Sequence, residues 1–255
     1  MKKKSTNRLA ILVVLLLCAI ILYALIYSAP SDEETTVMRG TGRHSGEVIR
    51  FVTVVIDPGH GGEDQGTSSG GLNEKDVNLD VSLKMRDILV KNGINVKLTR
   101  DNDTFIELKD RADYANGISA DLFISVHTNS LPQYPGFSGT ETLYAPQQPI
   151  INGVDSKRFA GIIQDNLVKK LNTNNHGIKS RPELAVLHHT KMPAVIAELG
   201  YITNAEERQN LGKPEFRQKA AEALAKATLD TLDKMDAYKN GDNKWVIPSK
   251  DRIKK

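Results

Sequence analysis

The stretch VVIDPGHGG, residues 54–62, joins a run of Val and Ile to a loop made of proline, glycines and one histidine. Such an apolar run, bounded by turn residues, is typical of a buried β-strand, and Pro and Gly commonly end one. A simple turn could use Gly or Asn and needs no imidazole, so we expect this loop to present His60 to a ligand. The strand and its loop therefore indicate both the fold and the position of the site.

Downstream of this loop, helical and strand-like patterns alternate. The segment 77–93 places apolar side chains four residues apart and stops at Asn92 and Gly93, and the segment 154–172 has the same period. Pro214 is expected to open the last helix. Short apolar strands are expected at 94–99, 121–127 and 194–199. This alternation predicts a single α/β domain with a mostly parallel twisted sheet flanked by helices.

The first 50 residues differ in composition from the rest of the chain. Three lysines and an arginine within residues 1–8 precede 19 uncharged residues, 9–27. A helix of that length rises about 28 Å, close to the ~30 Å hydrocarbon layer, so we expect an uncleaved single-pass transmembrane helix. The basic flank predicts that the remainder lies on the extracytoplasmic side. We expect a linker at 28–50, the catalytic domain at 51–238 and a polar tail at 239–255.

Charge and cysteine content narrow the function further. The 34 basic and 31 acidic residues give a net charge of only +3, and part of this excess lies at the two ends of the chain, so no nucleic-acid partner is expected. The single cysteine, Cys18, falls in the apolar run, which leaves the outer domain without a disulfide. We therefore expect a domain that is stabilised by its own hydrophobic core.

Four ionisable residues are predicted to meet at the carboxyl edge of the sheet, where α/β folds collect their ligands. His60 follows the expected strand at 51–57, and His127 ends the strand at 121–127. Glu198 ends the strand at 194–199, and Glu74 lies at the start of the first long helix. Two imidazoles and one carboxylate are a suitable ligand set for catalytic Zn²⁺. We assign His60, Glu74 and His127 as zinc ligands and Glu198 as the general acid and base.

Each assignment has an alternative. A histidine after a strand often serves only a structural hydrogen bond, and Glu74 could be a helix-start carboxylate favoured by the helix dipole. His188 and His189 are the main rivals as ligands. A phosphate cradle in the glycine loop is disfavoured, because GHGGEDQG carries two acids and no Lys or Arg.

Several motifs together resemble one known family. They are VVIDPGHGGEDQG, GLNEKDVNLD, VKLTRDND, LKDRADYAN, ADLFISVHTNS, SGTETLY and PAVIAELGYITN, spread over about residues 52–235. The chain is similar to the zinc-dependent N-acetylmuramoyl-L-alanine amidases of the amidase 3 family. The resemblance implies the same ligands, His60, Glu74 and His127, with Glu198 catalytic. It also implies the reaction, hydrolysis of the peptidoglycan amide between N-acetylmuramic acid and L-alanine.

Within that family, an anchored chain without wall-binding repeats is most similar to the sporulation and germination-specific amidases, which act in spore-cortex maturation by muramic-lactam formation. That places the domain outside the membrane, in the space between the two forespore membranes. The sequence departs from the family pattern at His188 and at the insert PQQPIINGV, where an activating protein partner could dock. Two other functions remain open: a peptidoglycan-binding module without catalysis, and a zinc peptidase that cuts within the stem peptide.

Overall fold

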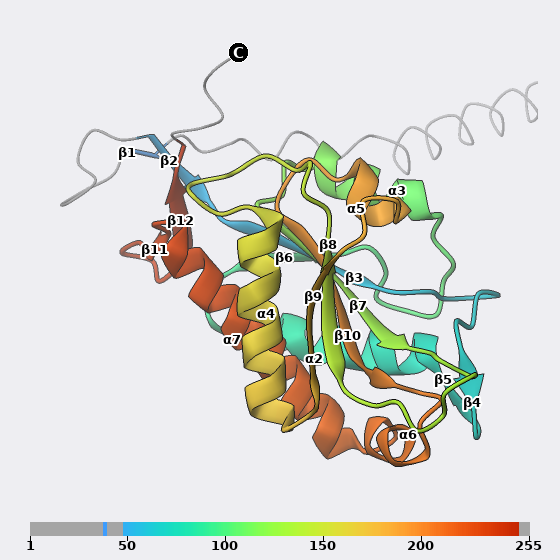
Figure 1. The fold of residues 1–255 in the computed structure, drawn as a ribbon. Helices are drawn as coiled ribbons and strands as arrows, with labels where there is room; N and C mark the ends of the chain where they lie inside the picture. The colour runs from blue at the N-terminus through green and yellow to red at the C-terminus, as the bar shows by residue number, and fades with distance from the viewer. Residues whose placement is uncertain (1–37, 40–47, 250–255) are drawn as a thin grey trace, which may run out of the picture. The chain divides into compact units, whose positions relative to one another are not determined.

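A six-stranded sheet forms the centre of the fold (Figure 1), with the strand order β6-β3-β7-β10-β8-β9. The computed structural model describes residues 38–39 and 48–249 of the chain. The strands of this sheet are β3 (Thr53–Pro58), β6 (Asn95–Leu98), β7 (Leu122–Asn129), β8 (Thr140–Tyr144), β9 (Asn175–Ser180) and β10 (Ala194–Tyr201). The predicted alternation of strands and helices is thus present.

The sheet is mixed, which refines the prediction of a mostly parallel sheet. The pairs β3–β6, β3–β7, β7–β10 and β8–β9 are parallel, whereas β10 and β8 pair antiparallel. Parallel neighbours need a long crossover, usually a helix. The connection 130–139 between β7 and β8 contains no helix, so β8 runs back against the direction of β7.

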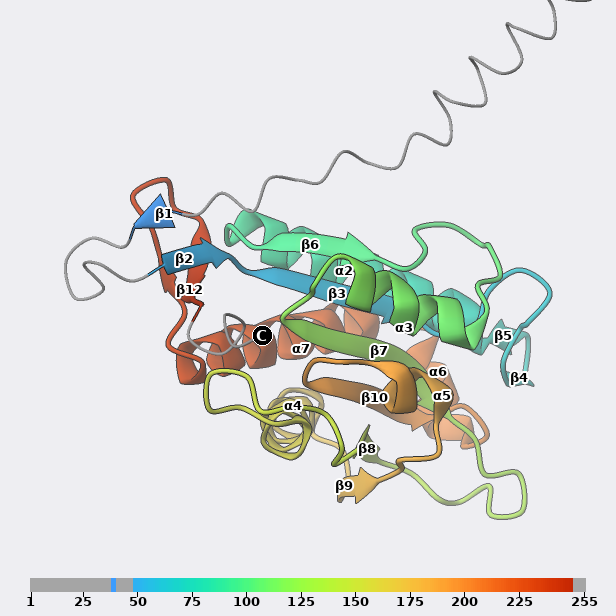
Figure 2. The same cartoon turned by 90° about the horizontal axis from the view of Figure 1, so that it is seen from above.

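Two layers of helices cover the sheet, as the view in Figure 2 shows. Helices α2, α4 and α7 lie on one face, and α3 and α5 lie on the other. The predicted apolar stripe of α2 is confirmed, because its four members are fully buried: Val77, Val81, Met85 and Leu89. The helices are α2 (Glu74–Lys91), α3 (Leu108–Gly117), α4 (Ser156–Leu171), α5 (Ala185–His189), α6 (Ala205–Leu211) and α7 (Pro214–Lys234), whose first residue is the predicted proline.

A second, four-stranded sheet was not predicted. It has the order β1-β2-β12-β11, made of β1 (Met38–Arg39), β2 (Val48–Phe51), β11 (Tyr238–Lys239) and β12 (Trp245–Pro248). Residues 48–50, expected in the linker, therefore belong to a strand. The expected polar tail contains β12, all of whose residues are buried. The run 51–57, expected as one strand, is divided between the two sheets at Val52, whose amide donates to the Trp245 carbonyl at 3.0 Å.

The predicted transmembrane helix, residues 9–27, lies outside the described residues. Among the helices that the structure does describe, none combines the length and the hydropathy needed to cross a membrane. The described residues cluster as one unit, consistent with a single α/β domain.

Candidate metal centre and active site

The loop after β3 holds His60 in a left-handed backbone conformation, with φ at +62°. That region is uncommon for a residue with a side chain, so the surrounding contacts must hold the loop in place. Arg100 donates to the carbonyls of Pro58 and Gly59, and Arg111 donates to those of Pro58 and His60, at 2.8–2.9 Å. The two guanidinium groups satisfy three consecutive carbonyls and fix the direction of the imidazole.

Arg111 itself is held by a buried carboxylate. Its Nη1 donates to Asp57 Oδ1 at 2.9 Å, and the two side chains are only 2% and 1% exposed. Asp57 also accepts from the hydroxyls of Thr99 and Ser125, at 2.6 and 2.7 Å. The guanidinium group of Arg111 and the carboxylate of Asp57 both have hydrogen-bond partners, so this buried ion pair can support the loop without leaving an unpaired charge.

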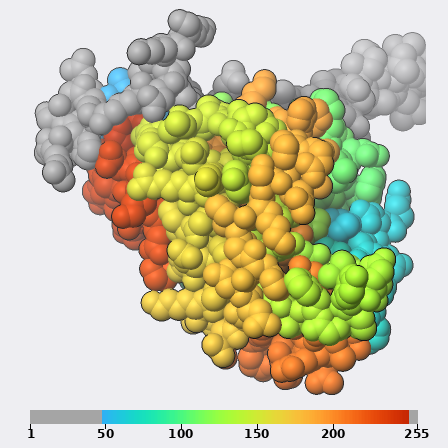
Figure 3. Space-filling model, in the orientation of Figure 1, coloured from blue at the N-terminus to red at the C-terminus, as the bar shows by residue number. Residues whose placement is uncertain are grey.

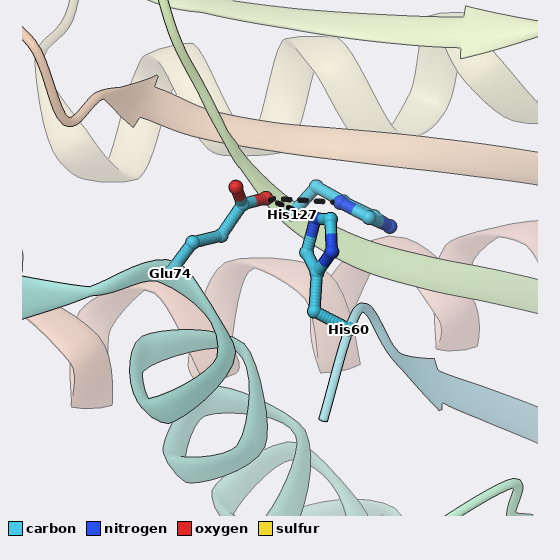
Figure 4. A group of neighbouring side chains, drawn as sticks. All are labelled: His60, Glu74 and His127. Carbon is cyan, nitrogen blue, oxygen red and sulfur yellow. Dashed lines mark hydrogen bonds and ion pairs between the residues drawn. The ribbon is translucent and has the colours of Figure 1, made fainter. Parts of the chain in front are cut away.

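The predicted ligands His60, Glu74 and His127 converge on one point, as Figure 4 shows. Glu74 Oε1 lies 3.2 Å from His60 Nε2 and 3.0 Å from His127 Nδ1, and one ligand atom from each residue lies within 4.8 Å of the others. Tetrahedral ligands about 2.0–2.1 Å from zinc lie about 3.4 Å apart. The donor types and their spacing therefore fit a zinc ion with three protein ligands.

Glu74 reaches this point because α2 begins there. A short hairpin of β4 (Ser68–Ser69) and β5 (Leu72–Asn73) leads directly into the helix. The Glu74 carboxylate accepts from the backbone amides of Thr67 and Thr128, at 3.0 and 3.1 Å. Burial opposes its charge, but hydrogen bonds and charge interactions with His127 and His60 hold the pKa of Glu74 well below its usual range. The carboxylate is thus ionised and pre-positioned, beyond the helix-start role considered as an alternative.

Two glycines make room for the cluster. A Cβ on Gly59 would lie 2.3 Å from the imidazole of His127, and a Cβ on Gly66 would lie 2.7 Å from both Glu74 Oε2 and the ring of His60. Both distances are far below ordinary contact. Gly59 and Gly66 are therefore required for close approach as well as for turning the chain.

Asp64 orients His60 from the side away from the cluster. Its Oδ2 lies 2.8 Å from His60 Nδ1, which leaves Nε2 facing Glu74. Burial lowers the pKa of His60, yet the hydrogen bonds and charges of Glu74 and Asp64 outweigh it and raise that pKa. Carboxylates bonded to the second nitrogen are common behind metal-binding histidines. Sequence reasoning missed Asp64, although its place four residues after His60 was a usable signal.

Glu198 lies on β10 beside the metal cluster. In register it pairs with His127 on β7 and with Glu141 on β8, so the three side chains point to the same face of the sheet. It is 9% exposed, and among the described residues its Oε2 finds no hydrogen-bond partner. Burial, followed by the charges of Glu74 and Glu141, raises the pKa of Glu198 well above its usual range. A carboxyl group in such a site can both accept a proton and return it.

Glu141 was missed by the sequence reasoning, since it lies between two threonines in TETLY, a segment with no strong apolar pattern to mark its carboxylate as buried. It is buried, and its two oxygens contact Asn129 Nδ2 at 2.6 Å and Lys179 Nζ at 2.7 Å. The strand register places the Glu141 carboxyl group beside Glu198, where it contributes to the raised pKa of Glu198. Glu141 is thus a neighbour that tunes the acidity of the proposed catalytic group.

A small apolar pocket adjoins the cluster on the α3 and α5 face. Its volume is about 130 Å³, and its lining includes His60 and His127 together with Leu108, Val186 and Ile196. The volume admits only a few heavy atoms, so the wall beside the metal ligands is suited to a small apolar group.

The remaining histidines lie elsewhere. His188 and His189, the rival ligands, contact each other at the end of α5 with ring centroids 5.0 Å apart, and neither belongs to the metal cluster. His176 lies in β9 and stacks on Phe137. His44 lies outside the described residues.

Comparison with known proteins decides the family. The family profile described as "Amidase_3: N-acetylmuramoyl-L-alanine amidase" matches residues 54–230. The chain belongs to the Amidase_3 family. That match spans every predicted site residue and every strand of the central sheet except the first residue of β3.

Three curated relatives are between 30% and 43% identical to this chain over the aligned residues. The protein YqiI of Bacillus subtilis is 43% identical over 70% of this chain and 84% of its own length. LytC, an N-acetylmuramoyl-L-alanine amidase of the same organism, is 38% identical over 69% of this chain, which spans only 35% of LytC. The germination-specific N-acetylmuramoyl-L-alanine amidase of B. subtilis is 30% identical over 69% of this chain and 78% of its own length.

Solved structures of the family share the fold. The N-acetylmuramoyl-L-alanine amidase of Clostridium difficile 630 aligns with a TM-score of 0.67 and 36% identity, over 72% of this chain and 97% of that structure. The CwlD amidase of Clostridioides difficile, solved in complex with the GerS lipoprotein, aligns with a TM-score of 0.66 and 28% identity. The alignment covers 71% of this chain and 98% of that structure. The α/β amidase domain is thereby established.

Proposed function

We propose that this chain is a zinc-dependent peptidoglycan amidase that hydrolyses the bond between N-acetylmuramic acid and L-alanine. The observation that carries the proposal is the placement of Glu198 beside the converging His60, Glu74 and His127. The family match supports the reaction class. The donor set and its spacing support zinc.

In the proposed mechanism, His60, Glu74 and His127 hold the ion, and Glu198 moves the proton. A zinc ion held by these three residues would supply Lewis-acid polarisation of the amide carbonyl and a lower pKa for water. Glu198 accepts a proton from the water that attacks the carbonyl carbon. The carboxyl group then returns this proton to the alanine nitrogen as the C–N bond breaks, which yields a free lactyl carboxylate and a free amine.

Two other functions use the same residues. A binding module would hold zinc and peptidoglycan without turnover, and a peptidase would cut an amide within the stem peptide. The geometry of Glu198 favours a catalytic role over a binding module, because a buried carboxyl oxygen without a hydrogen-bond partner among the described residues, beside His127, costs stability and gains nothing in a protein that only binds.

Product analysis tests the proposal. The purified full chain is incubated with peptidoglycan fragments and Zn²⁺, and the products are identified by mass spectrometry. The amidase predicts intact stem peptides with a free N-terminal L-alanine. Split stem peptides would identify a peptidase, and unchanged fragments in the presence of bound zinc would identify a binding module.

The cellular setting is part of the same proposal. The proposed single-pass anchor at 9–27 would put the domain on the extracytoplasmic side, where peptidoglycan lies, and 30% identity to a germination-specific amidase over 78% of its length supports a role in the spore cortex. A protein partner is proposed by analogy with the CwlD amidase, which was solved in complex with the GerS lipoprotein. Loss of cortex muramic lactam in a strain that lacks this chain, with restoration by the anchored form, tests the setting.

A further inference from the structure

A rigid loop with two exposed aromatic rings lies beside the proposed active site. It comprises residues 130–138, SLPQYPGFS, between β7 and β8, and we call it the aromatic loop. Tyr134 is 67% exposed and Phe137 is 37% exposed, both high for aromatic side chains. In Figure 3 the loop is the lime-green projection at the lower right, next to a hollow in the surface. Its residues enclose an open depression of about 690 Å³ that includes Leu131 and Gln133.

The aromatic loop is fixed to the active-site strands. Phe137 stacks on His176 of β9, with ring centroids 4.4 Å apart, and meets the edge of Tyr201 at 5.0 Å. Tyr201 ends β10, three residues after Glu198, and the loop itself starts after Asn129, two residues after His127. The aromatic loop is therefore joined, through the ends of β7 and β10, to the strands that carry His127 and Glu198.

Hydrogen bonds hold both ends of this loop. The Leu131 amide donates to the Thr203 hydroxyl at 2.9 Å, and Nε2 of His176 lies 2.8 Å from the Ser138 carbonyl. Within the loop, the amides of Tyr134 and Phe137 donate to the carbonyls of Leu131 and Tyr134. A loop ordered in this way loses little conformational entropy on binding, so its exposed rings are already positioned for a ligand.

The absence of charge on the aromatic loop favours the glycan strand of peptidoglycan over the stem peptide as its ligand. Residues 130–138 contain no charged side chain. Stem peptides carry free carboxylates, whereas N-acetylated sugars of a glycan strand are neutral and present apolar C–H faces together with amide groups. An uncharged surface of aromatic rings with one carboxamide, Gln133, complements the sugars.

We propose that the aromatic loop binds the glycan strand next to the muramoyl residue whose amide is cut, an inference that rests on the proposed function. Tyr134 and Phe137 pack against pyranose C–H faces, and polar groups of the loop contact the N-acetyl amides. The subsite makes glycan chain length, and not only the muramoyl peptide, a determinant of specificity.

A peptide-free β-1,4-linked N-acetylglucosamine tetramer tests this proposal separately from hydrolysis, because it has no muramoyl amide. Its binding to the zinc-loaded full chain is measured by calorimetry for the wild type, Tyr134→Ala, Tyr134→Trp and Tyr114→Ala. Tyr114, on α3 and 41% exposed, is the matched control outside the loop. We expect Tyr134→Ala to weaken binding about tenfold, while Tyr134→Trp and Tyr114→Ala retain it.

A second readout is the ratio of kcat/KM for a multi-sugar muramoyl-peptide substrate to that for a single-sugar one. Tyr134→Ala is expected to lower this ratio about tenfold. Failure of the tetramer to bind the wild type would overturn the proposal, as would equal binding by Tyr134→Ala and Tyr114→Ala. Binding of the tetramer without amide cleavage by any form would sustain the glycan subsite and refute the proposed hydrolysis.

Discussion

His127 and Glu198 occupy paired positions on the parallel strands β7 and β10, with their side chains on the same face of the sheet. The adjacent position on β8 holds Glu141. A proposed metal ligand, a proposed proton carrier and a charge that tunes it thus lie on three neighbouring strands. Because backbone hydrogen bonds fix this register, the site needs no movement of a loop to bring these three groups together.

The acidic limb of the pH profile of kcat/KM should depend on the interaction between Glu198 and Glu141. Glu198 must be ionised to accept a proton, so kcat/KM falls as pH decreases through its raised pKa. Glu141→Gln removes a nearby negative charge, which lowers the pKa of Glu198 and moves the acidic limb of the profile to lower pH. The measurement is a pH series of kcat/KM, with Glu222→Gln on α7 as the control. An unchanged or oppositely shifted limb would contradict the pairing.

Asp64 should strengthen zinc binding through His60. Asp64→Asn weakens the acceptor at His60 Nδ1, and loss of such a partner typically costs 10- to 100-fold in metal affinity. Competition with a fluorescent zinc chelator measures the change. Glu63→Gln, which alters an exposed carboxylate one residue earlier, should leave the affinity unchanged. Equal affinities of the two variants would remove Asp64 from this role.

Gly59→Ala should disrupt the cluster while leaving the fold intact. The new Cβ would lie 2.3 Å from the His127 ring, so the imidazole must move away from Glu74. We expect loss of zinc and of activity with a near-native circular dichroism spectrum. Gly117→Ala, where a Cβ meets nothing within 4 Å, is the control. Full zinc occupancy in Gly59→Ala would show that the ring does not need this space.

Arg111 should contribute to stability through Asp57. Arg111→Met leaves a buried carboxylate without its cation, which typically lowers the free energy of unfolding by about 3–5 kcal/mol. Urea denaturation measures the loss, and Arg86→Met, which breaks a surface pair with Asp87, should cost less than about 1 kcal/mol. Similar costs for both variants would mean that the buried pair does not support the loop.

The sequence was sufficient to predict the α/β class and the convergence of His60, Glu74 and His127. Strand ends and helix starts are local features, and a parallel sheet brings them to one edge. Glu198 was placed next to them for the same reason. The roles of these residues as ligands and as proton carrier stay predictions until metal binding and turnover are measured.

The second sheet could not be predicted in this way. Its strands are short, and β12 (Trp245–Pro248) is surrounded in sequence by charged and turn-forming residues that suggested a tail. Its partner β2 lies almost 200 residues earlier, so no local pattern reports the pairing. The support that Arg100 and Arg111 give to the loop escaped prediction because charged residues in polar segments are normally read as exposed.

Glu198→Gln tests the central claim most directly. Zinc content by mass spectrometry and amide cleavage are measured on the same preparation of the full chain, alongside wild type. We expect zinc content equal to wild type and cleavage reduced by about 10²–10⁴-fold, since the ligands remain and only the proton carrier is lost. Cleavage at the wild-type rate in the zinc-loaded variant would contradict the account.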